Sequence, residues 1–171
     1  MVHQSALPEK KQTSLGLYVT SAEAHEMWNT DPDGVRIIDV RTPEEYIFVG
    51  HAPMARNIPL GFIEYQWNVE ENEPVFRLNP VFMATLKGSF VPTDTLLVTC
   101  RSGGRSALAV NALAKAGFTN VYNITDGFEG DKVAEEGSVY LGKRMKNGWK
   151  NSGLPWTYDG DTNLLWIEKA D

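Results

Sequence analysis

The sequence is poor in the two residue types that most often bind metals. It has a single cysteine, Cys100, and three histidines, His3, His25 and His51. One cysteine excludes an internal disulfide, so the fold must be stabilised by packing alone. The histidines lack the spacing of metal ligands, which argues against a zinc site. We therefore expect no metal and no cofactor.

The chain also lacks long hydrophobic runs and an excess of basic residues. No apolar stretch approaches the ~20 residues that cross a bilayer, and residues 1–17 lack the apolar stretch of a signal peptide. We expect a soluble, cytoplasmic protein with no membrane partner, or a periplasmic one if this is a mature exported form. There are 16 Lys and Arg against 22 Asp and Glu, a net charge of −6. The basic residues are scattered, which argues against nucleic acid as a partner.

Short apolar runs alternate with helical patterns along the 171 residues, a length that suits one domain. Strands are predicted at three apolar runs, 35–40, 95–99 and 120–124. Helices are predicted over 20–28, from 42 onward, over 79–87 and over 106–116. The alternation predicts an α/β fold with a mostly parallel sheet covered on both faces.

Local signals sharpen several of these boundaries. Thr20 with Glu23, and Thr42 with Glu45, have the spacing of capping boxes at helix starts. Gly117 can supply the left-handed residue that ends the last helix. Two segments carry no such signal. Residues 1–16 are expected to form a loose polar arm, and residues 61–79, which mix aromatic and acidic side chains, an ordered loop or short helix.

Cys100 lies where the strongest predicted strand ends, just before the strongest predicted helix. The connection, residues 101–105, reads Arg-Ser-Gly-Gly-Arg. Adjacent glycines allow successive amide N–H groups to turn inward as an anion-binding nest, and the helix N-terminus adds positive potential. The two arginines supply forked donors for a sulfur oxyanion or a phosphate. The connection therefore favours the thiolate of Cys100 and predicts a site for a charged sulfur.

Motifs along residues 17–130 resemble the rhodanese-like domain family. They are the loop Cys100-Arg101-Ser102-Gly103-Gly104-Arg105-Ser106, the upstream Asp39-Val40-Arg41 with Glu45-Tyr46, Gly50-His51-Ala52-Pro53 and Asn57-Ile58-Pro59, and the downstream Asn120-Val121-Tyr122 to Asp126-Gly127. The resemblance recurs at Gly148-Trp149 and Gly153-Leu154-Pro155. It implies a rhodanese-like α/β domain over residues 17–171, with a central, mostly parallel five-stranded sheet and helices on both faces.

The resemblance implies a sulfurtransferase. Cys100 would be the catalytic nucleophile, taking the outer sulfur of a donor anion such as thiosulfate as a persulfide and passing it to cyanide or a thiol. The substrate-binding residues would be those of the loop: Arg101, Ser102, Gly103, Gly104, Arg105 and Ser106. The loop amides would stabilise the negative persulfide, while Arg101 and Arg105 would orient the anionic donor.

Other residues of these motifs are interpreted as structural rather than catalytic. Asp39 and Arg41 end a predicted strand at the same crevice, and we interpret them as a structural ion pair in support of the site rather than as catalytic groups. Glu45 is interpreted as a helix cap and His51 as a hydrogen bonder that holds a turn. Residues 131–147 depart from the family pattern. We interpret them as an insertion near the active site that forms one wall of its pocket.

Two alternatives remain open. One is a persulfide carrier or protein-interaction module, in which residues 61–79 and 131–147 dock a dedicated partner such as a protein sulfur acceptor. The other is a small phosphatase or arsenate reductase on the same fold. Four residues separate Cys100 from Arg105, one fewer than in tyrosine phosphatases, and the smaller loop suits a single sulfur better than a phosphate.

Overall fold

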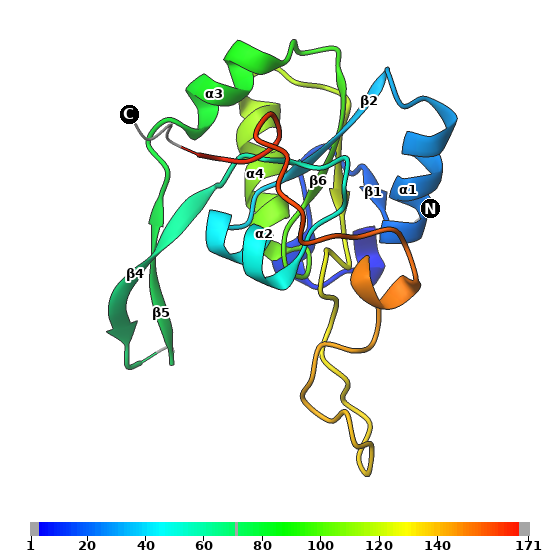
Figure 1. Cartoon of the computed structure of the whole chain (residues 1–171), viewed down its shortest axis with the longest axis vertical. Helices are drawn as coiled ribbons and strands as arrows, with labels where there is room; N and C mark the ends of the chain where they lie inside the picture. The colour runs from blue at the N-terminus through cyan, green and yellow to red at the C-terminus, as the bar shows by residue number, and fades with distance from the viewer. Residues whose placement is uncertain (1–3, 71, 168–171) are drawn as a thin grey trace.

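The computed structural model describes residues 4–70 and 72–167, which form layers around a parallel sheet (Figure 1). The sheet has five strands in the order β1-β7-β6-β2-β3, and every neighbouring pair is parallel. The strands are β1 Tyr18–Val19, β2 Val35–Asp39, β3 Arg56–Asn57, β6 Thr95–Thr99 and β7 Val121–Ile124. The predicted fold class is confirmed, and the three predicted strands are β2, β6 and β7.

Both predicted capping boxes begin helices. Within the described residues the α-helices are α1 Ser21–Thr30, α2 Pro43–Val49, α3 Phe82–Ser89 and α4 Gly104–Lys115. Short 3₁₀ helices occupy η1 Gln4–Ala6, η2 Glu9–Lys11 and η3 Lys150–Ser152. The side chains of Thr20 and Thr42 accept the N–H of Glu23 and Glu45, whose carboxylates accept the cap N–H in return. Each box thus pairs backbone donors that a helix start leaves free.

The core consists of two apolar clusters, one on each face of the sheet. Leu96 and Val98 of β6 pack with Leu113 of α4. Leu97 faces the opposite way and packs with Ala24 of α1. All five residues are at most 1% exposed, and truncating a buried leucine to alanine typically costs ~2–5 kcal/mol. Because both faces are covered, the carboxyl edge of the sheet is where a ligand can approach.

A two-stranded hairpin projects from the body to the lower left in Figure 1. It consists of β4 Gly61–Asn68 and the antiparallel β5 Glu73–Leu78. The prediction of an ordered loop or short helix for residues 61–79 is therefore wrong. Ile63, Tyr65 and Trp67 alternate with polar residues at the period of a strand. These three side chains are 48%, 110% and 59% exposed, so the alternation marks no buried face.

The N-terminal segment is packed against the body, although the sequence predicts a loose arm. Lys11 and Thr13 are only 5% and 4% exposed. The Thr13 N–H donates to Tyr18 Oη at 2.7 Å, and the Ser14 N–H donates to Asn111 Oδ1 of α4 at 2.8 Å. Hydrogen bonds carry much of this packing, which is why an analysis of apolar periodicity does not detect it.

Residues 131–147 extend downward from the body as a long loop (Figure 1). A bridge joins Val133 to Leu141 within the loop. At its base, Lys11 Nζ pairs with Asp131 Oδ1 at 2.7 Å. The chain then returns to the body, where Trp149 is buried. The loop and the hairpin are thus the two segments that stand out from the parallel sheet and its helices.

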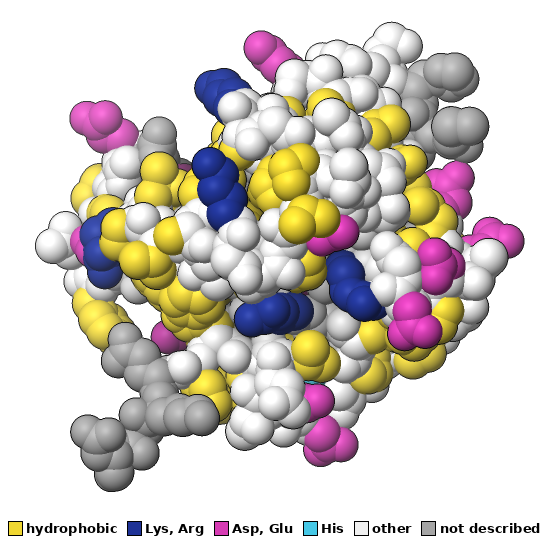
Figure 2. All heavy atoms as spheres, turned by 90° about the horizontal axis from the view of Figure 1, so that it is seen from above, with side chains coloured by type: hydrophobic (Ala, Val, Ile, Leu, Met, Phe, Trp, Pro, Cys, Tyr) yellow, Lys and Arg dark blue, Asp and Glu magenta, His cyan; other side chains and the backbone are white. Residues whose placement is uncertain are grey.

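The surface and the helices bear on which larger partners the protein can have. Figure 2 looks down on the molecule from the top of Figure 1 and shows Lys and Arg lying singly among acidic and apolar side chains. This face has no continuous basic surface of the kind that binds a nucleic-acid duplex. Among residues 4–70 and 72–167, no helix combines the length and apolar character needed to cross a membrane.

Candidate active site

Cys100 lies in the turn between the end of β6 and the start of α4. The turn depends on Gly103, the N-cap of α4, which has a φ of 96°. A Cβ on Gly103 would collide with the backbone of Thr125, so glycine is required at this position. The turn holds the cysteine at the N-terminus of α4, where unpaired N–H groups create a positive potential.

The sulfur of Cys100 is enclosed by its own loop. Cys100 is 1% exposed, and its Sγ accepts a hydrogen bond from the Gly103 N–H at 3.1 Å. The Ser106 Oγ lies 3.4 Å from Sγ. The sequence predicts a nest of several amides; Gly103 supplies the backbone contact to Sγ among the described residues. Because the thiol is covered, a reagent can reach it only if neighbouring side chains move.

Asn123, which the sequence did not single out as a site residue, connects the loop to the N-terminal segment. It is fully buried in β7, and its Nδ2 donates to the carbonyls of Lys11 and Gly103 at 3.0 and 3.1 Å. These two acceptors fix the amide so that Oδ1 accepts from Ser106 Oγ at 2.6 Å. The one hydroxyl hydrogen of Ser106 can serve either Asn123 or the sulfur, which places an adjustable donor beside Cys100. The sequence signal that could have identified Asn123 is a polar residue inside an otherwise apolar predicted strand.

Arg105 is held by Glu45. Its Nη1 and Nη2 donate to the two carboxylate oxygens at 2.7 and 2.6 Å. Burial raises the pKa of Glu45, but the hydrogen bonds and charge of Arg105 outweigh it, and the pKa lies below its usual 4.5. Glu45 is a helix cap, as predicted, and it also pairs with Arg105. Because two of its donors are already used, Arg105 has less capacity to bind a donor anion than its place in the sequence predicts.

Asp39 and Arg41 form a second ion pair, and both side chains are fully buried. Arg41 Nη2 donates to Asp39 Oδ2 at 2.7 Å and to the Gly50 carbonyl at 2.8 Å. The guanidinium also lies 4.3 Å from the centre of the Phe128 ring. Because Asp39 ends β2 and Gly50 follows α2, the contacts of Arg41 join the end of β2 to the segment after α2.

His51 contacts the helix that precedes it. Its Nδ1 lies 3.0 Å from the Tyr46 carbonyl oxygen, and its ring stacks on the Tyr46 ring with centroids 3.7 Å apart. These contacts agree with the interpretation of His51 as a residue that holds a turn. Within the described part of the chain, no group of three or more His, Cys, Asp or Glu side chains is arranged to hold a metal.

The remaining loop residues lie closer to solvent. Arg101 is exposed, and Ser102 and Gly104 are half-buried. The Arg101 carbonyl accepts the N–H groups of Glu129 and Gly130, at 3.0 and 3.2 Å. The backbone of Arg101 is therefore fixed to the segment after β7, while its guanidinium has no carboxylate partner among the residues that the structure describes.

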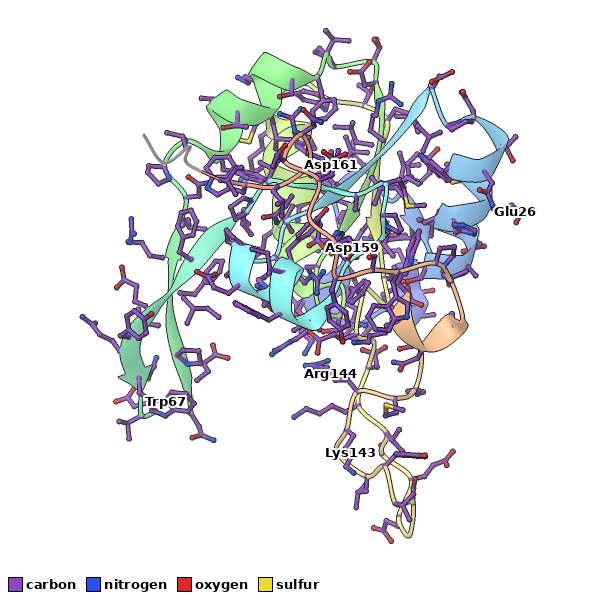
Figure 3. The ribbon with its side chains drawn as sticks, viewed as in Figure 1. Glu26, Trp67, Lys143, Arg144, Asp159 and Asp161 are labelled. Carbon is purple, nitrogen blue, oxygen red and sulfur yellow. The ribbon has the colours of Figure 1, made fainter. Side chains whose placement is uncertain are left out.

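A groove of about 510 Å³ opens beside the loop. Its walls come from the loop, from the β4–β5 hairpin and, through Lys132, from the start of residues 131–147. Arg144 lies above Lys143 on the same segment, closer to the body (Figure 3). Arg144 Nη1 donates to the Gly130 carbonyl at 2.7 Å, and the Gly130 N–H donates to the Arg101 carbonyl at 3.2 Å. Burial and the charge of Arg101 lower the pKa of Arg144. Lys132 is the residue of segment 131–147 that lines this groove.

The fold and the cysteine loop define a known class of domain. The model of the rhodanese-like domain matches residues 20–134, which is more than half of the chain. The protein therefore belongs to the rhodanese-like domain family.

Several known proteins are similar to the chain. An uncharacterized protein of Rickettsia rickettsii is 30% identical over 141 residues, 82% of this chain and 96% of the relative. The chloroplastic thiosulfate sulfurtransferase 16 of Arabidopsis thaliana is 38% identical over 95 residues, 56% of this chain and 72% of the relative. The crystal structure of Rv0390 from M. tuberculosis superposes with a TM-score of 0.62 at 30% identity, covering 82% of this chain and 96% of that one.

Proposed function

We propose that this protein is a sulfurtransferase that moves a sulfane sulfur from a donor such as thiosulfate to a thiol or cyanide through a persulfide on Cys100. The observation that carries the proposal is the position of Sγ, which accepts the Gly103 N–H at 3.1 Å at the N-terminus of α4. Such an environment stabilises negative sulfur. The name of the Arabidopsis relative, a thiosulfate sulfurtransferase, supports the same chemistry.

In the first half-reaction the Cys100 thiolate attacks the outer sulfur of thiosulfate. A new S–S bond forms, the bond to the inner sulfur breaks, and sulfite leaves with its electron pair. The Gly103 N–H and the Ser106 hydroxyl contact Sγ, so they can stabilise the thiolate that attacks in this step and that is released when the persulfide is passed on. Arg101 is the loop arginine that can orient the donor, because Arg105 is paired with Glu45.

Intact mass spectrometry tests this directly. Exposure to thiosulfate should add one sulfur, ~32 Da, and cyanide or dithiothreitol should remove it. Cys100→Ser keeps a small polar side chain and should accept no sulfur. Uptake by the variant at the rate of the parent would contradict the assignment of Cys100.

A persulfide carrier that serves a protein acceptor is the second candidate. The exposed apolar side chains of the hairpin, Ile63, Tyr65 and Trp67, favour it, because contiguous exposed apolar surface often marks a protein contact. A carrier should load one sulfur from thiosulfate yet turn over slowly with small acceptors. Comparing the amount of persulfide formed with the steady-state rate of thiocyanate production distinguishes a carrier from an enzyme that turns over with small acceptors.

The arrangement of Arg105 argues against a phosphatase or arsenate reductase. Those reactions need a free guanidinium opposite the thiolate, whereas both terminal nitrogens of Arg105 donate to Glu45. We expect no turnover of p-nitrophenyl phosphate under conditions in which thiosulfate loads Cys100. Turnover that disappears in Cys100→Ser would favour the phosphatase.

A further inference from the structure

The groove beside the loop is large for a sulfur oxyanion alone. Its volume of about 510 Å³ lies within the range of about 300–1,000 Å³ that is typical of pockets for organic ligands. Two of its walls, the hairpin and Lys132, come from segments outside the parallel sheet and its helices. The groove therefore has room for a second substrate next to the loop that carries Cys100.

The charges that line the groove are unbalanced in favour of cations. Arg105 and Glu45 neutralise each other. Arg101 and Lys132 have no ion-pair partner in the part of the chain that the structure describes. Glu73 is the remaining carboxylate on the lining, so two free cations stand against one anion. In an acidic protein with a net charge of −6, this local excess favours an anionic ligand.

One wall of the groove is apolar. Ile63 and Phe76 of the hairpin lie opposite each other in the strand register and are 48% and 36% exposed, and Pro74 also belongs to the lining. The Phe76 ring also faces the Arg105 guanidinium, with 5.9 Å between its centre and the guanidinium carbon. Such a wall can contact the carbon skeleton of a ligand. An inorganic acceptor such as cyanide has no skeleton to place there.

We propose that this groove binds the sulfur acceptor and that the acceptor is a small organic thiol that bears a carboxylate. The carboxylate lies towards Arg101 and Lys132, the carbon skeleton contacts the hairpin, and the thiol faces the loop. This assignment rests on the proposed sulfurtransferase function. In this assignment the hairpin and Lys132 of the insertion form the acceptor site together with the cysteine loop.

The transfer step balances without any further reagent. The acceptor thiol loses its proton to solvent, and its thiolate attacks the terminal sulfur of the Cys100 persulfide. A bond forms between the acceptor sulfur and the terminal sulfur, and the bond to Cys100 Sγ breaks. The electron pair of that bond stays on Sγ, so the products are an organic persulfide and the Cys100 thiolate.

Discharge of the preformed persulfide by three thiols of similar size tests the proposal. The protein is first loaded with thiosulfate, freed of excess donor and checked by intact mass. It is then mixed with 3-mercaptopropionate, 2-mercaptoethanol or cysteamine, which are anionic, neutral and cationic at the charged end. Because the three thiols differ in intrinsic reactivity, the quantity compared is the variant-to-parent rate ratio for each thiol.

Lys132→Gln should slow discharge by 3-mercaptopropionate about two- to fivefold, the size expected for a solvent-exposed charge interaction. Lys132→Glu should slow it further and should remove the decline in rate that added salt causes in the parent. The ratio for 2-mercaptoethanol should stay near one, and the ratio for cysteamine should not fall. Lys143→Gln is the matched control: Lys143 is exposed on the same segment but lies outside the groove lining, and it should leave all three ratios near one.

The outcomes distinguish the two proposals. If the persulfide forms and the Lys132 variants change all three rates equally, the acceptor site is overturned and the sulfurtransferase stands. If Lys143→Gln slows the anionic thiol as much as Lys132→Gln does, the effect belongs to the whole loop and the groove assignment is also overturned. If thiosulfate leaves no sulfur on Cys100, the proposed function fails and the acceptor site fails with it.

Discussion

The floor of the candidate site and its walls are built in opposite ways. The floor consists of the cysteine loop and two ion pairs, Asp39–Arg41 and Glu45–Arg105, whose side chains are at most 20% exposed. The walls are the β4–β5 hairpin and residues 131–147, where side chains such as Trp67 and Val139 are 59% and 79% exposed. The floor is therefore buried and paired within the protein, whereas the walls carry side chains that face solvent.

The largest expected difference lies between the buried and the exposed ion pairs. Arg41→Ala leaves the fully buried Asp39 carboxylate without its partner and should cost about 3–5 kcal/mol of unfolding free energy. Arg77→Ala breaks a hairpin pair with Glu64 in which Arg77 is 59% exposed, and it should cost at most about 1 kcal/mol. Urea denaturation of both variants measures the contrast. Equal losses would show that the floor and the walls are equally dependent on ion pairs.

Arg101 and Arg105 should separate donor binding from loop structure. Arg101→Ala should lower kcat/KM for thiosulfate about tenfold while leaving stability nearly unchanged, because its exposed guanidinium is free. Arg105→Ala should cost about 1.5–3 kcal/mol of stability, since it removes two charge-assisted hydrogen bonds to Glu45.

Kinetics with two donors complete this comparison. Arg105→Ala should slow sulfur transfer from an uncharged organic polysulfide to Cys100. Arg101→Ala should not, because only a charged donor needs the free guanidinium. The opposite pattern, in which Arg105→Ala impairs thiosulfate alone, would mean that Arg105 leaves Glu45 to bind the donor.

The Glu45–Arg105 pair should make the stability of the floor depend on pH. The pKa of folded Glu45 lies below its usual 4.5, so the stabilisation is present above that value and is lost as pH falls through the folded pKa. Glu45→Gln keeps an oxygen that can serve the capping box but carries no charge. The parent should exceed the variant by about 1–3 kcal/mol at pH 7, and the gap should close in acid. Urea denaturation from pH 7 to pH 3 measures it; a gap that is constant with pH would contradict the depressed pKa.

The smallest effect is expected at the outer end of the hairpin, where Trp67 lies in Figure 3. Trp67→Ala should change stability by less than about 0.5 kcal/mol and should leave thiosulfate loading unchanged, because the side chain contributes little to the core. Thermal unfolding and persulfide formation are the measurements. A large loss of stability would show that the hairpin is part of the folding core rather than a wall added to it.

The sequence correctly predicted the elements whose start, end and periodicity are set by residues close together in the chain. The capping boxes at Thr20 and Thr42, the strand Thr95–Thr99 and the left-handed Gly117 follow from short-range rules, and the structure has each of them. The hairpin was missed because its alternating side chains face solvent on a projecting pair of strands. The packing of Lys11 was missed because it depends on a hydrogen bond to Asn123, far along the chain.

The sequence by itself determined the α/β class, the membership of the rhodanese-like family and the cysteine loop between a strand and a helix. These features depend on residues that are adjacent or regularly spaced in the chain. Only the tertiary structure decided which arginine is free, because the partner of Arg105 is Glu45, on the helix that follows β2. It also brought the hairpin, the loop and Lys132 to one groove. Long-range pairings of this kind depend on how the elements pack, and no local spacing in the sequence encodes them.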